Sequence, residues 1–263
     1  ANEGIAGALY ATGYASLGEK ADFYDDRFGP KAYAPRGYYS SEVFRRPPAA
    51  LEPYLARCED NWKNLEKPKG DKRRALLWAC AQVRLMNSFI DANNLSELEK
   101  VIDLNSAYSY MFAVSFSGHW DSFLGNANND FLYFRADPAA PYGGTWFVLP
   151  WDLDHTFGVS APQQAGAPYD QFASRTENRL FTFLLNHPES KRRYLEIARA
   201  RLASLSEASI LEAVKVESGQ LKAARLGTWE EKRGVDYAGA TAGLLKFLSD
   251  RFKALRASLA ALP

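Results

Sequence analysis

Two aromatic and β-branched runs stand in the middle of a chain whose other long segments have helical spacing. The runs are residues 131–135 (FLYFR) and 145–149 (TWFVL), and residues 136–144 between them include two Pro and two Gly. Such runs around a turn-forming segment predict a β-hairpin with a long loop. Because antiparallel strands lie about 5 Å apart, the residues before and after a hairpin meet at one end of it.

Helical spacing is found on both sides of the predicted hairpin. Apolar residues recur at steps of three and four over residues 74–90, which predicts a helix there. A second helix is predicted from Ser96, as the N-cap, to about Phe116, with Gly118 ending it. The C-terminal part shows the same spacing in four further segments: 177–187, 191–204, 207–225 and 239–260. A hairpin inside a helical body is an α+β arrangement.

The N-terminal part has a different character. Residues 1–45 are rich in Gly, Ala and Tyr, which predicts short strands and turns, with one brief helix near residues 21–27. The Lys-rich residues 67–74 are predicted to form an exposed loop. The first residue is Ala and no signal peptide is visible, so we expect that a leader was removed or that the chain is part of a longer protein.

Composition and charge exclude several classes of function. Lys and Arg number 32 against 31 Asp and Glu, a formal net charge of +1, which does not suit a non-specific nucleic-acid binder. No apolar run approaches the about 20 residues that cross a bilayer, so no membrane span is expected. Cys58 and Cys80 make neither a disulfide framework nor a zinc site. We expect two free buried thiols, with a single bridge as the alternative.

Acidic and amide side chains flank the predicted hairpin. Asp121, Asn126 and Asn129 precede its first strand, and Asp152 and Asp154 follow its second. If the hairpin brings its ends together, these oxygens converge, and such ligands suit a hard cation such as Mg²⁺. Asp121 and Asn126 also form D-x-x-x-x-N. Protein kinases use that spacing for a proton-accepting Asp and a metal-holding Asn, with another metal-holding Asp after the next strands.

Each of these residues also has a structural interpretation. Asp121 suits a helix cap, Asn residues suit turns, and Asp152 and Asp154 are compatible with bonds to backbone amides or to Arg. His119 and His155 lie beside the acids. For both histidines we expect a structural role, with a role as base or phosphate contact as the alternative.

The sequence resembles the CotH-type kinase family, which is named for bacterial spore-coat proteins. The most specific mark of the family is PWDLDHTFG following an NN-x-φ-L-Y strand, and it lies within residues 98–158 of this chain. Two later segments, ENRLFTFLLNHPESKRRYLE and GLLKFLSDRFKALRASL, are similar to the family's helical tail. The segment GYASLGEKADFYDDRFG resembles, more loosely, the stretch ahead of the family's helices.

The resemblance implies an atypical kinase-like α+β fold. Residues 71–263 would be a mostly helical C-terminal lobe with the hairpin inserted at the active site. Residues 1–70 would be a linker and the remnant of a truncated β-rich N-terminal lobe. The implied activity is an ATP-dependent phosphotransferase that uses Mg²⁺ or Mn²⁺ and phosphorylates a Ser or Thr hydroxyl of a protein substrate. The implied location is secreted, or on a cell or spore surface.

The resemblance also assigns roles to residues of this chain. The family's catalytic Asp corresponds to Asp121, and its metal-binding Asp to Asp152, with Asp154 close behind. The family's Asn corresponds to Asn129 by its place before FLY, or to Asn126 by its count from Asp121, and both assignments stay open. The implied ATP-binding residues are Asn126, Asn129 and Asp154, and the implied metal ligands are Asp152, Asp154 and Asn129.

One departure from the family's pattern leaves other functions open. The family's β-rich lobe carries a nucleotide-binding Lys and a phosphate-covering loop, but residues 1–45 hold only a remnant, without G-x-G-x-x-G or a P-loop. Lys20 and Lys31 are candidates for that Lys by default. The alternatives are a non-catalytic kinase-like module for binding or surface assembly, and a metal-assisted phosphate-ester hydrolase.

Overall fold

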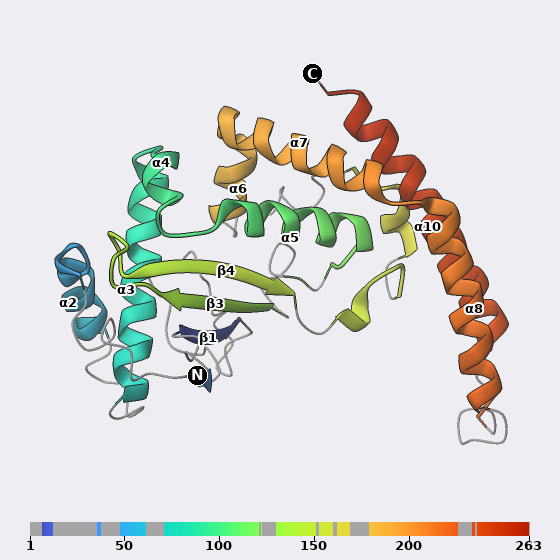
Figure 1. Cartoon of the computed structure of the whole chain (residues 1–263), viewed down its shortest axis with the longest axis horizontal. Coiled ribbons are helices and arrows are strands. Elements are labelled where there is room, and N and C mark those ends of the chain that lie inside the picture. The colour runs from blue at the N-terminus through green and yellow to red at the C-terminus, as the bar shows by residue number, and fades with distance from the viewer. Residues whose placement is uncertain are drawn as a thin grey trace.

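A computed structural model of the chain is shown in Figure 1. The residues that it describes are 7–12, 36–37, 48–61, 71–120, 122, 130–150, 153–159, 162–168, 179–225, 233–234 and 236–262. The brief helix expected near residues 21–27 lies outside these residues, as do Lys20 and Lys31. In the described part, no helix combines the length and hydropathy that crossing a bilayer requires.

The predicted hairpin is confirmed. Strand β3 (Asp130–Ala136) pairs antiparallel with β4 (Gly144–Pro150), and each strand is one residue longer at both ends than the sequence predicted. Strand β1 (Gly7–Thr12) pairs with the other edge of β3, and the short β2 (Arg36–Gly37) pairs with β1. The sheet order is β2-β1-β3-β4, so the described strands of the N-terminal part extend the sheet of the hairpin.

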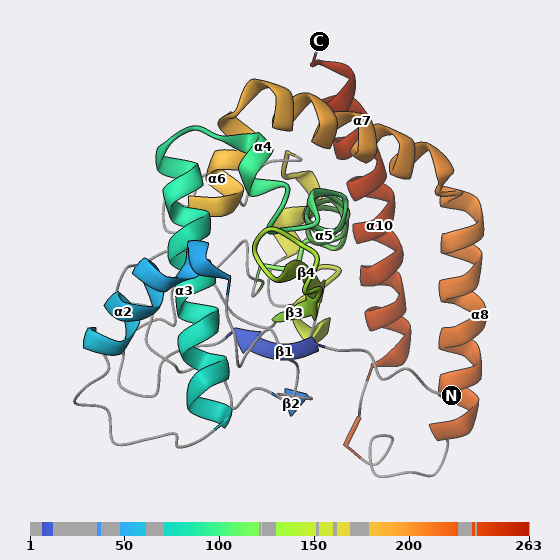
Figure 2. The same cartoon turned by 60° about the vertical axis from the view of Figure 1, so that its left-hand side comes forward.

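The structure describes eight helices. They are α2 (Glu52–Asn61), α3 (Asp71–Asp91), α4 (Leu95–Leu98), α5 (Leu104–Ser117), α6 (Arg179–Asn186), α7 (Pro188–Ser204), α8 (Glu207–Arg225) and α10 (Tyr237–Ala260). Figure 2 shows α3 on one side of the hairpin and of α5, and α10 and α8 on the other. The helices predicted in the C-terminal part are therefore confirmed, with bounds shifted by at most three residues, and the α+β class with them.

Alternating side chains of the hairpin form the core between these helices. Leu132 and Phe134 of β3 and Trp146 and Val148 of β4 are buried, as expected for one face of a period-two strand. Trp78 of α3 packs on this face, with its ring centroid 3.9 Å from that of Phe134 and 5.9 Å from that of Trp146. The aromatic residues that make the two strands recognisable in the sequence thus also fix the hairpin to α3.

The single helix predicted over residues 96–116 is two helices, and the backbone of the hairpin explains the break. The Asp103 N–H donates to the Trp146 carbonyl at 2.9 Å, and the Trp146 N–H donates to the Val101 carbonyl at 2.8 Å. These peptide groups pair with β4 and cannot also make helical bonds. Helix α4 therefore ends at Leu98 and residues 99–103 are not helical, and α5 begins after Asp103, its N-cap.

Two further predictions about helix starts are wrong. The N-cap of α4 is Asn94, whose side chain accepts from the Glu97 N–H at 3.1 Å, while the Ser96 hydroxyl donates to that same side-chain oxygen. Residues 71–74, predicted as part of an exposed loop, are the first turn of α3, and residues 67–70 lie outside the described residues. The helix predicted over residues 74–90 is confirmed as α3.

The long loop of the hairpin is anchored at the end far from the acids. The Tyr142 hydroxyl donates to Glu97 Oε2 at 2.6 Å, and Gln82 Nε2 donates to the Tyr142 carbonyl at 2.7 Å. Burial and the bond to Glu97 raise the pKa of Tyr142 to about 12, while bonds from Lys100 and Tyr142 lower the pKa of Glu97. Glu97 therefore stays ionised and keeps accepting at neutral pH, which holds the loop against α3 and α4.

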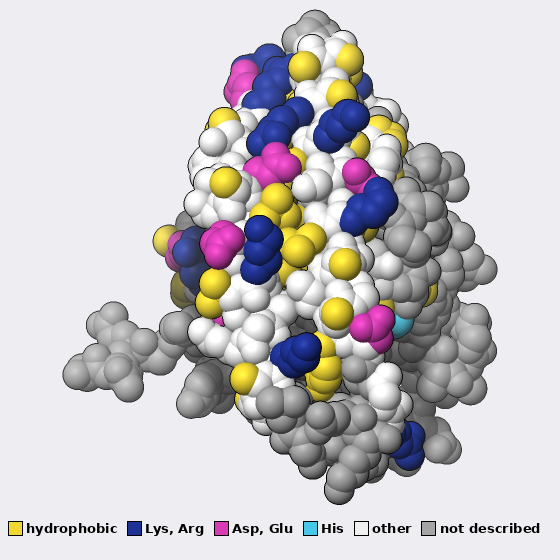
Figure 3. All heavy atoms as spheres, turned by 90° about the vertical axis from the view of Figure 1, so that its right-hand side faces the viewer, with side chains coloured by type: hydrophobic (Ala, Val, Ile, Leu, Met, Phe, Trp, Pro, Cys, Tyr) yellow, Lys and Arg dark blue, Asp and Glu magenta, His cyan; other side chains and the backbone are white. Residues whose placement is uncertain are grey.

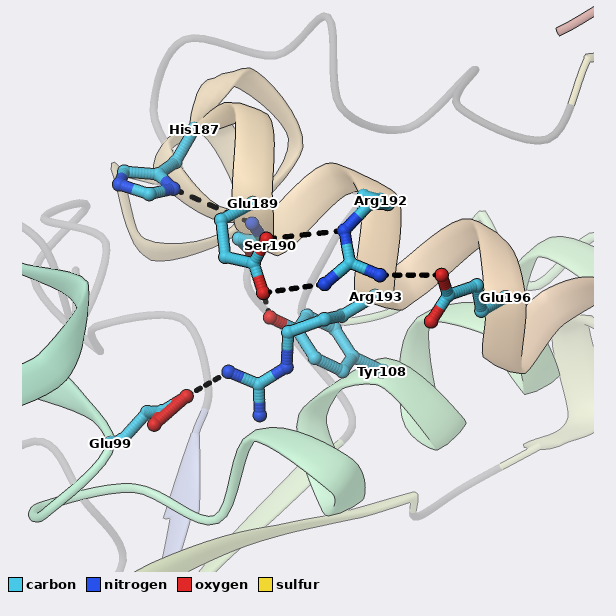
Figure 4. A network of polar contacts seen from close by, with 8 residues as sticks. All are labelled: Glu99, Tyr108, His187, Glu189, Ser190, Arg192, Arg193 and Glu196. Atoms are coloured by element: carbon cyan, nitrogen blue, oxygen red, sulfur yellow. Dashed lines mark hydrogen bonds and ion pairs between the residues drawn. The ribbon is translucent and has the colours of Figure 1, made fainter. Parts of the chain in front are cut away.

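A polar network joins the start of α7 to α5 and to the residue after α4 (Figure 4). The Tyr108 hydroxyl donates to Ser190 Oγ at 2.8 Å, and Arg193 forms an ion pair with Glu99. His187 caps α7 by accepting the Ser190 N–H at 3.4 Å. Helix α7 is thereby fixed to α5, the helix that leads into the segment before the hairpin.

The expectation of two free thiols is wrong, because Cys58 and Cys80 form a disulfide. Cys58 lies on α2 and Cys80 on α3, and both are buried. The packing of these two helices places the Cα atoms 6.2 Å apart, within the range that a disulfide can span. The distance depends on how α2 packs against α3, and the spacing of the two residues in the sequence does not give it.

Removal of this bridge should destabilise the fold. The bond joins residues 22 positions apart, and closing a loop of that size contributes about 3 kcal/mol to the free energy of unfolding. We expect the variant Cys58→Ala, Cys80→Ala to lose about that amount in urea unfolding. Reductant should lower the midpoint of the wild type and leave the variant unchanged. A wild-type midpoint equal to that of the variant under oxidising conditions would contradict the bridge.

Candidate active site

The segment before the hairpin begins where α5 ends. Gly118 ends the helix as predicted, with a left-handed φ of +64° and its N–H bonded to the Val114 carbonyl. The His119 N–H also donates to the Val114 carbonyl, at 3.1 Å, so the chain turns tightly away from the helix axis. The turn leads through Trp120 toward Asp121.

The segment after the hairpin returns to this turn. It forms a short 3₁₀ turn, η2 (Leu153–His155), and the Phe157 N–H then donates to the Ser117 carbonyl at 2.6 Å. The rings of Trp120 and His155 lie 5.2 Å apart, centroid to centroid. The described residues on the two sides of the hairpin are thus in direct contact, as the hairpin geometry predicts.

A single aromatic ring from α10 packs on both segments. A Cβ on Gly118 would lie 2.9 Å from Phe247 Cζ, and a Cβ on Gly158 would lie 2.7 Å from Phe247 Cδ2. Gly158 also has a left-handed φ, of +88°. The Phe157 ring meets the Phe247 ring edge-on at 6.3 Å. Both turns therefore need glycine, for backbone conformation and for the close approach of Phe247.

Four of the five predicted site residues lie outside the described residues: Asp121, Asn126, Asn129 and Asp152. The fifth, Asp154, lies on η2 with 63% of its side chain exposed, and its Oδ2 is 3.8 Å from His155 Nε2. Its carboxylate faces solvent beside the contact between the two segments. Among the described residues alone, no group of three or more His, Cys, Asp or Glu side chains is arranged to hold a metal ion.

The two histidines beside the acids differ in environment. His119 is fully buried, and its Nδ1 lies 3.5 Å from the His155 carbonyl oxygen. His155 is partly exposed, and its ring lies against Trp120. These contacts join the two segments and support the structural role expected for both residues.

Comparison with models of known protein families identifies the family of this chain. The model of the family described as "CotH kinase protein" matches residues 52–255. The chain belongs to the CotH kinase family. No curated protein and no solved structure is significantly similar to it. The match to the CotH kinase family runs from α2 into α10 and includes both segments that flank the hairpin, with Asp121, Asp152 and Asp154 inside its bounds.

A buried arginine that the sequence analysis missed holds the surroundings of the site together. Arg251 of α10 is fully buried and donates to the Ser115 carbonyl on α5 at 2.7 Å through Nε. Its Nη1 donates to the carbonyls of Gln164 and Ala167, in and after the 3₁₀ turn η3 (Pro162–Gly166). Burial lowers the pKa of Arg251 to about 10, so it remains a cation at neutral pH. In this member of the CotH kinase family, it joins α5, α10 and η3.

A substitution at Gly158, in the segment PWDLDHTFG, tests the packing of Phe247 against the segment after the hairpin. The substitution Gly158→Ala places a Cβ at a left-handed φ and against Phe247, and we expect it to cost about 2 kcal/mol of unfolding free energy. The matched control is Gly219→Ala on α8, where a Cβ would meet nothing within 4 Å. Since Ala favours a helix over Gly, the control should gain roughly 0.5–1 kcal/mol. Urea unfolding measures the free energy of unfolding of both variants. Equal values for Gly158→Ala and Gly219→Ala would contradict the packing of Phe247 against Gly158.

Proposed function

We propose that this chain transfers the γ-phosphoryl group of ATP to a Ser or Thr hydroxyl of a protein substrate, with Mg²⁺ or Mn²⁺ as the metal. One observation carries the proposal. Within the region matched by the CotH kinase family, the segment that leads into Asp121 and the segment that follows Asp152 meet, through the bond from Phe157 to Ser117 and the contact of Trp120 with His155. A phosphotransferase needs its base and its metal ligands within reach of one phosphoryl group.

The proposed roles follow from the chemistry of each group. Asp121 orients the acceptor hydroxyl and accepts its proton as the hydroxyl oxygen bonds to the γ-phosphorus and the bond to ADP breaks. Asp152 and Asp154, with Asn129 or Asn126, would hold the metal, because carboxylate and amide oxygens are the ligands that Mg²⁺ prefers. A metal held by these residues would neutralise charge on the phosphate oxygens. The solvent-facing carboxylate of Asp154 supports its part in this set.

The proposal extends to the fold and to the location of the protein. We infer an atypical kinase-like fold, in which residues 71–263 form the helical lobe and residues 1–70 the reduced N-terminal part. In the structure β1 pairs with β3, so the N-terminal part adds strands to the sheet of the hairpin. We also infer a secreted protein, or one on a cell or spore surface. The buried disulfide supports that location, since such bonds persist in oxidising compartments.

Two variants separate the role of the base from that of the metal ligand. Asp121→Asn should lower phosphoryl transfer by about 100-fold or more while metal-dependent ATP binding persists, since a general base contributes to the chemical step. Asp152→Asn should weaken metal-dependent ATP binding at least tenfold, roughly the loss expected when a metal site is impaired. Transfer of labelled phosphate to protein measures the first effect. Calorimetry with ATP and Mg²⁺ or Mn²⁺ measures the second.

A matched control and the contrary outcomes complete the test. Glu217→Gln also removes one exposed carboxylate, on α8, and should change neither measurement. Equal transfer by the wild type and by Asp121→Asn would contradict the proposed base. A wild type that binds no metal–ATP and transfers no phosphate would instead identify a non-catalytic module for binding or surface assembly.

A further inference from the structure

We propose that a groove beside the candidate active site binds an apolar side chain of the protein substrate, on the stretch of chain next to the acceptor hydroxyl. The inference rests on the proposed phosphotransferase function and names a determinant of its specificity. The groove has a volume of about 590 Å³ and lies between the segment after the hairpin, α8 and α10. A cavity of this size can enclose a large side chain with its neighbouring backbone.

The walls of the groove are mainly apolar. Val159, which follows η2, and Leu221 of α8 line it and are 57% and 50% exposed. Leu244 and Phe247 of α10 also line the groove; Leu244 is half-buried and Phe247 is buried. Figure 3 shows the face of the molecule that α8 and α10 form, where hydrophobic side chains lie among charged ones. Exposed apolar side chains gathered around one hollow are typical of a binding surface.

The groove is continuous with the candidate active site. Asp154, Thr156 and Phe157 line it. The backbone of Phe157 is bonded to Ser117 at the end of α5, and its ring packs against Phe247. A polypeptide with one side chain in the groove would therefore continue directly to the place where the two flanking segments meet.

The charges of the lining favour a polypeptide over the nucleotide. The charged residues among the described lining are Asp154, Lys246 and Asp250, and Lys246 Nζ pairs with Asp250 Oδ2 at 2.5 Å. The proposed function assigns Asp154 to the metal, so the rest of the described lining carries no net charge. Triphosphate recognition needs cations that are free to pair with it, and Lys246 already pairs with Asp250. A neutral apolar side chain needs no such partner and gains from burial against Leu221 and Val159.

Peptide acceptors that differ at one flanking position test the inference. The probe is an array of synthetic peptides with a single Ser, in which each flanking position is in turn Leu, Phe, Gly, Lys or Asp. With Mg²⁺ and ATP, the wild type should prefer Leu or Phe over Gly about tenfold in kcat/KM at one position, the discrimination that burial of such a side chain provides. The preference should appear mainly in KM, because the apolar walls at Leu221 and Val159 are not among the groups proposed to take part in the transfer.

Substitutions at the exposed walls then connect that preference to the groove. Leu221→Asp and Val159→Asp should abolish it and raise KM for the preferred peptide about tenfold, with metal–ATP binding unchanged. The matched control is Val216→Asp, on the same helix as Leu221, at an apolar residue that is 46% exposed and does not line the groove. It should keep the wild-type preference. Because all three residues are about half exposed and none belongs to the buried core, thermal unfolding should stay close to that of the wild type.

The outcomes distinguish failure of the proposed substrate groove from failure of the proposed phosphotransferase function. If the wild type phosphorylates all peptides equally, or if Leu221→Asp retains the preference as Val216→Asp does, the groove is not a substrate site and the phosphotransferase function stands. A wild type that binds no metal–ATP and phosphorylates nothing overturns the proposed function, and the inference with it. Loss of metal–ATP binding in Leu221→Asp but not in Val216→Asp would assign the groove to the nucleotide and also overturn the inference.

Discussion

The packing of Phe247 against Gly118 and Gly158 is the contact on which the candidate active site depends. The two glycines lie 40 positions apart in the sequence, before and after the hairpin, and each has a left-handed φ where the ring approaches. Side chains at these positions would displace the ring or the turns. The bond from Phe157 to Ser117 then fixes the two segments at hydrogen-bond distance.

The rest of the fold holds these segments in place from several directions. The hairpin is fixed at its loop by Tyr142 and along its buried face by Trp78. Arg251 ties α10, which carries Phe247, to α5 and to η3 through backbone carbonyls. A cation buried against neutral carbonyls stabilises little by charge alone, but it satisfies several acceptors at once and so specifies one arrangement. Helices of the C-terminal part thus position the described residues on the two sides of the hairpin, 117–120 and 153–159.

Local patterns in the sequence predict most of the helices and strands. The features that they do not predict depend on packing between residues far apart in the sequence. Periodicity identifies α3 and the helical tail, and the aromatic runs identify the hairpin, because these signals reside in neighbouring residues. The break between α4 and α5 depends on pairing with Trp146, and the disulfide depends on how α2 packs against α3, so neither can be inferred from spacing in the sequence. The contact between the two flanking segments follows from hairpin geometry. The contacts that Phe247 and Arg251 make with these segments and with α5 come from a helix distant in the sequence, so no local pattern predicts them.

We propose that the segments before and after the hairpin share one divalent ion. A crystal structure with Mn²⁺ and a non-hydrolysable ATP analogue, with anomalous scattering at the manganese edge, measures this directly. We expect an anomalous peak about 2 Å from a carboxylate oxygen of Asp152 and close to Asp121. Carboxylates of Asp121 and Asp152 that point into separate regions, with manganese bound elsewhere or not at all, would refute the shared ion.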